Sequence, residues 1–187
     1  MEMKSGFNSA KWVPALFVSF LFILNILPII APVLAFFGER RISGFIYWMY
    51  QFTCHQKASR SFFICDNQCG WCARCTFLWL ATFVSSGIVF YYKPAFAFKG
   101  ISLKTAILLS LPLALDGGIQ LLATMYSLYT ASTPFYESTN SIRAVTGILF
   151  GTGIGLFLFP RLHDELRGNT SQSMSVSSTR NKLPNGL

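Results

Sequence analysis

Four long apolar segments constrain the fold of this chain more than any other feature. They cover about residues 12–37, 76–92, 103–130 and 142–159 and are joined by short polar or basic connections. A helix of about 20 apolar residues crosses the hydrocarbon of a bilayer, where backbone groups must pair within a helix or a closed barrel. The sequence therefore predicts an all-α integral membrane bundle of about four transmembrane helices.

The composition agrees with a membrane location. Only 12% of the residues are charged, whereas a soluble domain carries about 25%, and the mean hydropathy is +0.48. A net charge of +8 would suggest nucleic-acid binding in a soluble domain. Here the Lys and Arg residues stand at the ends of apolar segments, where they anchor helices and set topology. We therefore expect the lipid bilayer as a partner and no nucleic acid.

The chain divides into three regions by composition. Residues 1–11 form a polar N-terminal segment, residues 12–160 the transmembrane domain, and residues 161–187 a polar tail rich in Ser, Thr and Asn. Pro160 and Arg161 are expected to end the last helix, because proline donates no backbone hydrogen bond. The tail has too little apolar content to fold and is expected to be disordered.

The distribution of Lys and Arg predicts the orientation. Four spans put both termini on one side, and that side carries more Lys and Arg than the other. Basic segments stay in the cytoplasm, so the termini are expected there, although Arg40 and Arg41 flank the first span on the opposite side. The segment between the first two spans then lies at the outer face.

A short amphipathic segment precedes the second span. Residues 42–52 carry apolar side chains at helical spacing, together with aromatic side chains suited to the headgroup level. The segment is too short to cross a bilayer, so an interfacial helix is predicted. Such a helix delivers Cys54 and His55 to the membrane boundary.

Two features inside the spans concern packing. Asn25 is polar at the middle of the first span, where it is expected to bond a neighbouring helix. The fourth span carries three glycines spaced four residues apart, Gly147, Gly151 and Gly155. Such a stripe lets another helix approach closely, within one bundle or between two.

All five cysteines and one of the two histidines lie between residues 54 and 75. Cys72-x-x-Cys75 at the start of a helix is a common half-site for tetrahedral zinc, because two thiolates converge while backbone amides favour their ionised form. Cys54 and His55 could close the site. We therefore predict a metal site, with zinc favoured over iron, made by Cys54, His55, Cys72 and Cys75.

Two other interpretations of the cysteines stay open. Five is an odd number and the outer face is oxidising, so two disulfides with one remaining thiol would also fit. Alternatively, Cys72 and Cys75 form a catalytic thiol pair of the CxxC type.

A second polar cluster lies inside the predicted spans. Asp116 and Gln120 are four residues apart and share one helix face. A carboxylate at mid-bilayer is costly, so Asp116 should point inward and find a partner. It is either a functional group or one half of a structural ion pair with Arg143 or Arg74.

A pocket that combines both clusters would offer a proton carrier, amide donors and cations suited to a phosphate or carboxylate. The candidate catalytic residues are therefore Asp116, Gln120, Arg143, Arg74 and Gln56. The candidate substrate-binding residues, which would hold an anionic lipid or small molecule, are Arg60 and Arg74.

Several motifs resemble those of one family. They are Cys54-His55-Gln56, Cys72-Ala73-Arg74-Cys75, Asp116-Gly117-Gly118-x-Gln120 and Asn140-x-x-Arg143-x-x-Thr146-Gly147. Over about residues 40–155 the chain is similar to an uncharacterised family of small bacterial and archaeal membrane proteins, a domain of unknown function. The resemblance implies residence in a prokaryotic plasma membrane and one shared site for these motifs. It implies no established activity, and Cys65 and Cys69 fall outside its motifs.

Three classes of function remain after these observations. The first is a metal-dependent protein that acts on a lipid or isoprenoid head group, with the metal as Lewis acid or activator of water. The second is a membrane thiol-disulfide oxidoreductase that uses Cys72 and Cys75. The third is a transporter or accessory subunit, in which Asp116 carries protons and the cysteines tie a loop. Whether the protein is an enzyme stays open at this stage.

Overall fold

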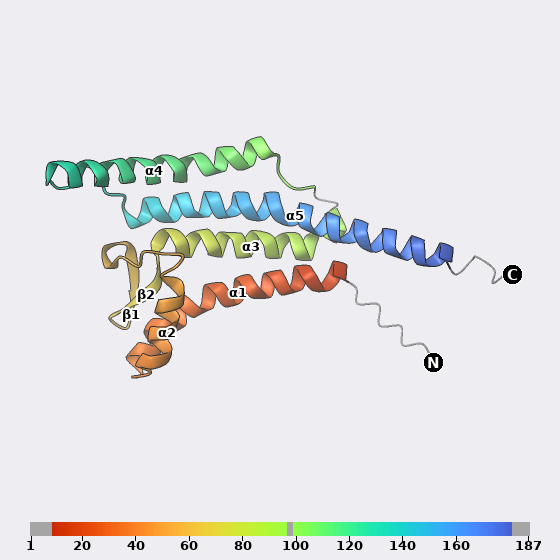
Figure 1. Cartoon of the computed structure of the whole chain (residues 1–187), viewed down its shortest axis with the longest axis horizontal. Coiled ribbons are helices and arrows are strands. Elements are labelled where there is room, and N and C mark those ends of the chain that lie inside the picture. Colours follow the sequence, from red (N-terminus) through yellow and green to blue (C-terminus); the bar gives the residue numbers. More distant parts are fainter. Residues whose placement is uncertain (1–8, 97–98, 181–187) are drawn as a thin grey trace.

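The computed structural model describes residues 9–96 and 99–180. In this part of the chain the backbone forms five α-helices and one small hairpin (Figure 1). The helices are α1 (Ser9–Phe36), α2 (Arg40–Tyr50), α3 (Ala73–Phe96), α4 (Leu103–Thr130) and α5 (Asn140–Arg180). The hairpin consists of β1 (Ser61–Ile64) and β2 (Asn67–Cys72), and a 3-10 turn, η1 (Ala58–Arg60), precedes it.

Four of these helices are long and apolar enough to cross a membrane. The candidate spans are Trp12–Phe36, Ala73–Tyr91, Leu103–Thr130 and Asn140–Glu165. The long helices run side by side, with the start of α1 and the end of α5 at one end of the bundle and α2 with the hairpin at the other (Figure 1). The prediction of an all-α bundle with four spans is confirmed.

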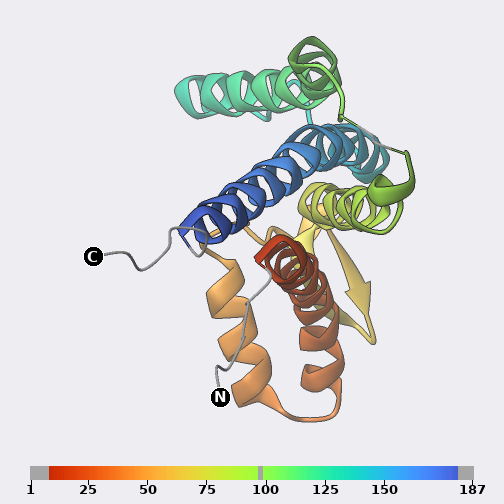
Figure 2. The ribbon, with the colours of Figure 1, turned by 90° about the vertical axis from the view of Figure 1, so that its right-hand side faces the viewer.

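The helices α3, α5 and α4 lie in that order across the bundle, with α1 on the far side of α3 (Figure 2). The contact between α3 and α5 is the closest, because the glycine stripe of α5 faces α3. A Cβ atom at Gly147 would come within 2.6 Å of the carbonyl oxygen of Arg74, and one at Gly151 would overlap that of Leu78. The predicted stripe therefore packs within one bundle.

Polar side chains tie α1 to its neighbours through hydrogen bonds to backbone carbonyl groups. Asn25 donates from Nδ2 to the carbonyl oxygen of Trp79 in α3 at 3.2 Å, so its predicted packing role is confirmed. Pro28 has no N–H for the carbonyl of Leu24. The hydroxyl of Tyr50 in α2 donates to that free oxygen at 2.9 Å. A backbone group left over by a proline thus docks the short helix α2.

The helix α2 lies crosswise at the end of α1 and corresponds to the predicted interfacial helix (Figure 1). Ser43, Ile46 and Tyr50 are buried, whereas Phe45 and Trp48 on its other face are exposed. An exposed apolar face on a short helix at the end of a bundle is typical of a helix that lies in the membrane surface.

The hairpin was not predicted from the sequence. Its strands pair antiparallel, with Ser61 opposite Cys72 and Ile64 opposite Asn67. The connecting residues Cys65 and Asp66 both have positive φ, 50° and 59°, as a two-residue type I′ turn requires. Neither position is a glycine, so this turn has little local signal in the sequence. As a result Cys72 ends β2 and precedes the first turn of α3.

The predicted end of the last helix at Pro160 is wrong. Helix α5 continues through Pro160 to Arg180, so residues 161–180 of the predicted disordered tail are helical. Pro160 cannot donate to the carbonyl oxygen of Leu156, but the backbone N–H of Ile101 donates to it at 3.2 Å. This bond from the α3–α4 connection satisfies the carbonyl that the proline frees. Residues 1–8 and 181–187 of the predicted terminal segments lie outside the described residues.

Candidate functional site

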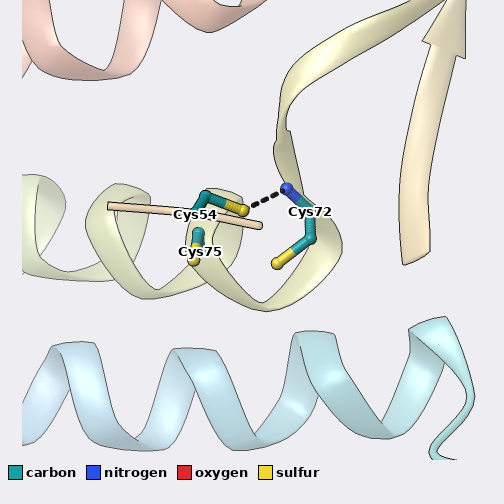
Figure 3. Close-up of side chains that lie close together, drawn as sticks. All are labelled: Cys54, Cys72 and Cys75. Atoms are coloured by element: carbon teal, nitrogen blue, oxygen red, sulfur yellow. Dashed lines mark hydrogen bonds between the residues drawn. The ribbon is translucent and has the colours of Figure 1, made fainter. Parts of the chain in front are cut away.

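Three cysteines converge at the end of the bundle where α2 and the hairpin lie. The Sγ atoms of Cys54, Cys72 and Cys75 all lie within 4.8 Å of one another (Figure 3). Cys54 follows α2, Cys72 ends β2 and Cys75 lies in the first turn of α3. Cys54 is buried and the other two are half-buried. Three of the four predicted metal ligands are therefore brought together.

A core of aromatic side chains positions the cysteines. Trp71, which precedes Cys72, is 1% exposed. Its ring contacts Tyr50 of α2, with centroids 5.0 Å apart, and stacks on Trp79 of α3 at 6.1 Å. The hairpin is thereby held against both helices that flank the cysteine cluster.

Hydrogen bonds favour a negative charge on the cluster. The backbone N–H of Cys72 donates to Sγ of Cys54 at 3.3 Å (Figure 3). The pKa of Cys72 is held far below its ordinary value, first by the Cys54 and Cys75 thiols and then by the N–H groups of Cys75 and Arg74 at the start of α3. The pKa of Cys54 is raised, because its thiol bonds to Cys72. Between Cys54 and Cys72, the surroundings therefore favour the ionised form of Cys72.

The remaining predicted ligand and the other cysteines lie outside the cluster. His55 is exposed and is not a member of the three-residue group, so its role as a ligand stays a prediction. Cys65 is exposed in the hairpin turn, and Cys69 is buried on β2, where burial raises its pKa. All five cysteines are free. The three cysteines that converge are thus those of the motifs Cys54-His55-Gln56 and Cys72-Ala73-Arg74-Cys75.

The cysteine cluster forms part of the wall of a cavity of about 170 Å³. The same wall contains His55, four basic side chains and two amides. The basic side chains are Lys57, Arg60, Arg74 and Arg143, and the amides are Gln56 and Gln120. The predicted metal-ligand, catalytic and substrate-binding residues therefore surround one cavity, with the exception of Asp116.

Gln56 fixes the shape of the segment that carries Cys54. Its backbone has a positive φ of 46°, and its side-chain amide donates to the carbonyl oxygen of Tyr47 in α2 at 2.9 Å. The amide of Gln68 in β2 donates to the carbonyl oxygen of Gln56 at 2.6 Å. This segment is consequently bonded to both α2 and the hairpin.

Two arginines meet at Gln120 on the α4 side of the cavity. Arg143 in the first turn of α5 is 3% exposed and Gln120 is 6% exposed. The Gln120 amide is oriented with its oxygen toward the two arginine donors. This oxygen accepts from Nη2 of Arg143 at 2.9 Å and from Nη2 of Arg60 at 3.0 Å. Oε1 of Glu137 lies 3.3 Å from Nε of Arg60 and 3.8 Å from Nη2 of Arg143.

Asp116 lies behind the cavity wall and forms an ion pair with Arg74. It also accepts hydrogen bonds from the hydroxyl of Tyr136 at 2.6 Å and from that of Ser138 at 3.0 Å. The ion pair with Arg74 is one of the two structural alternatives that the sequence offered. Asp116 therefore orients Arg74 and fixes the loop before α5.

Sequence reasoning missed the loop residues Tyr136, Glu137 and Ser138. A usable signal was present, since the chain has only 7 acidic residues and Glu137 stands close to Arg143 in the sequence. A rare carboxylate at the end of a span is a candidate partner for a nearby arginine.

The family described as "Predicted membrane protein (DUF2085)" matches residues 54–157, more than half of the chain. The chain belongs to this family. The matched region contains the cysteine cluster, the arginines and both glutamines of the cavity, and it confirms the resemblance to an uncharacterised family of membrane proteins.

An archaeal protein is also similar to this chain. "Uncharacterized protein MJ1492" of Methanocaldococcus jannaschii is 31% identical over 156 residues, which are 80% of this chain and 92% of that protein. No solved structure matches the chain.

Proposed function

We propose that this DUF2085 member is a metal-dependent membrane protein that acts on the head group of a lipid or isoprenoid. In this proposal Cys54, Cys72 and Cys75 hold a zinc ion. The observation that carries it is the convergence of three thiols on the wall of a cationic cavity.

The donor set fits zinc. Tetrahedral zinc with Zn–S bonds of about 2.3 Å separates two sulfur ligands by about 3.8 Å. The three Sγ atoms already lie within 4.8 Å of one another, so small side-chain rotations suffice. Three protein ligands leave one of four positions for water or substrate, as in catalytic zinc sites. Bound zinc would supply a Lewis acid or an activated water.

The surroundings of the cavity support a lipid substrate. The part of α4 that follows Gln120 exposes apolar side chains, among them Leu122, Met125 and Leu128. On the other side, α2 exposes Phe45 and Trp48. Apolar surface thus flanks a polar, cationic cavity, an arrangement that suits an amphiphile with an anionic head group.

The location follows from the same features. We place the protein in the plasma membrane of a prokaryote, supported by its four candidate spans and its archaeal relative. The excess of Lys and Arg on the side of the termini supports cytoplasmic termini. The cavity then opens at the outer face.

The proposal predicts the metal content of the purified protein. Elemental analysis of protein prepared without chelator should find about one zinc per chain in the wild type. Cys72→Ser and Cys75→Ser should lose most of it, because each removes a ligand. Cys65→Ser is the matched control and should retain it, since Cys65 is exposed in the hairpin turn. Equal metal content in all variants, or none in the wild type, would contradict the proposal.

A thiol-disulfide oxidoreductase is the second candidate. The CxxC spacing of Cys72 and Cys75 and the lowered pKa of Cys72 favour it. A wild-type sample without metal, but with a reversible disulfide between these two cysteines, would support this candidate. A transporter that protonates Asp116 has less support, because this carboxylate is engaged by three donors.

A further inference from the structure

The cavity contains more positive than negative charge. Arg60, Arg74 and Arg143 all line it, and Lys57 adds a fourth basic group. Asp116 neutralises Arg74 from behind the wall. Arg143 is 3% exposed, and a buried cation is costly unless it is paired and hydrogen-bonded. The groups that pair with Arg60 and with Arg143 therefore indicate which kind of ligand the cavity can bind.

These two arginines are incompletely paired within the described residues. They share the single amide oxygen of Gln120, and Nη1 of Arg143 also donates to Oδ1 of Asn140 at 3.2 Å, but both of these acceptors are neutral. Their ion pairs are both with one oxygen of Glu137, which lies 3.3 Å from Arg60 but 3.8 Å from Arg143. The Glu137 side chain is 55% exposed, and an exposed carboxylate compensates a cation weakly. One carboxylate does not satisfy both guanidinium groups.

We propose that Arg60, Arg143 and Gln120 bind a phosphate group, and that Glu137 occupies its place when no ligand is bound. A phosphate group has several acceptor oxygens and up to two charges, so it can pair with two guanidinium forks at once. Gln120 offers its NH₂ group as a further donor when the amide turns.

The cavity is large enough for a phosphate group. The cavity volume of about 170 Å³ exceeds the share of several water molecules in the liquid, about 30 Å³ each. A phosphate group fits beside the three thiols on the same wall. This inference rests on the proposed function, because it takes the same cavity as the ligand site. It adds that the anionic group bound there is a phosphate. The phosphate group belongs either to a lipid head group or to free phosphate.

The test measures binding to the purified full chain in detergent micelles. Two probes are used: inorganic phosphate, and a short-chain phosphatidic acid with the matching diacylglycerol as the control that lacks the phosphate. Wild-type protein should bind at least one phosphate-bearing probe and should not bind the diacylglycerol with comparable affinity. Binding of phosphatidic acid alone identifies the lipid as the source, whereas binding of both probes shows that the phosphate group suffices.

Variants assign the binding to named side chains. Arg60→Gln should weaken binding at least tenfold, and Glu137→Gln should tighten it several-fold because a competing carboxylate is removed. Arg41→Gln is the matched control, since Arg41 is exposed on α2 at the same end of the bundle. Arg60 is preferred to the buried Arg143, whose loss threatens folding, and circular dichroism checks the helical content of every variant.

Two results would overturn the inference: neither probe binds the wild type, or Arg60→Gln binds as well as Arg41→Gln. Metal analysis of the same samples separates the two proposals. Phosphate binding by a wild type without metal would refute the metal centre and support the anion site. Metal retained in Arg60→Gln together with unchanged phosphate affinity would refute the anion site alone.

Discussion

Asp116 accepts hydrogen bonds from three side chains that come from two different parts of the chain. Arg74 belongs to α3, whereas Tyr136 and Ser138 belong to the loop before α5. A carboxylate can accept several such bonds at once, whereas an amide must turn its NH₂ group toward some of the same donors. The charge and the acceptor-only character of Asp116 both matter here.

We therefore expect Asp116→Asn to destabilise the protein by about 3 kcal/mol, the effect of removing one partner of a largely buried ion pair. The measurement is the free energy of unfolding in mixed micelles. Asp66→Asn is the control, because Asp66 is exposed in the hairpin turn, where asparagine also tolerates a positive φ. Equal stability of the two variants would show that Asp116 does not hold Arg74 in place.

The elements differ in how far they could be predicted from the sequence. Hydropathy and length located the spans, and Leu103–Thr130 has the predicted limits. The continuation of α5 past Pro160 depends on Ile101, far away in the sequence, which bonds the freed carbonyl of Leu156. Such a tertiary partner leaves no local signal. The hairpin was missed for a different reason, since its turn uses Cys65 and Asp66 in a conformation that glycine or asparagine usually signals.

The candidate site could be predicted largely because its polar residues stand inside the spans or at their ends. Polar side chains are rare in such segments, so Arg74, Gln120 and Arg143 were conspicuous in the sequence. Their distribution over one cavity, and the position of Asp116 behind its wall, required the packing of α4 against α5 and the geometry of the loop before α5. Glu137 was missed because loop carboxylates are ordinarily solvated, although its rarity and its closeness to Arg143 in the sequence were a usable signal.

The close contact between α3 and α5 predicts a specific sensitivity to a single methyl group. Gly151→Ala should destabilise the protein by about 1–3 kcal/mol, because its Cβ would overlap the carbonyl oxygen of Leu78. Gly87→Ala, on α3, is the control: a Cβ there meets nothing within 4 Å, and alanine favours helix. Unfolding in mixed micelles compares the two variants. A loss of stability as large in Gly87→Ala would mean that helix flexibility, rather than close packing, explains the glycines.

At the scale of the whole molecule, the cavity lies at the end of the bundle that carries α2 and the hairpin, and the helix ends near the termini lie at the opposite end (Figure 1). The orientation of the termini therefore decides which compartment the cavity meets. The exposed thiol of Cys65 in the hairpin turn provides a natural probe for this end.

With cytoplasmic termini, a membrane-impermeant maleimide should label Cys65 in intact cells. Cys65→Ser should abolish most of this labelling, because Cys54 and Cys69 are buried and Cys72 and Cys75 are half-buried. Labelling that appears only after the membrane is permeabilised would place the cavity on the cytoplasmic side and reverse the orientation that the charges predict.

The close contact between α3 and α5 extends to the cavity. Gly147 lies one helical turn after Arg143, and it faces the backbone carbonyl of Arg74, which stands between Cys72 and Cys75. The spacing of the two helices at this point therefore sets the distance between the thiols on one side and the buried guanidinium on the other. A single added methyl at Gly147 would change the width of the cavity, and with it the size of the ligand accepted, without altering any residue that lines it.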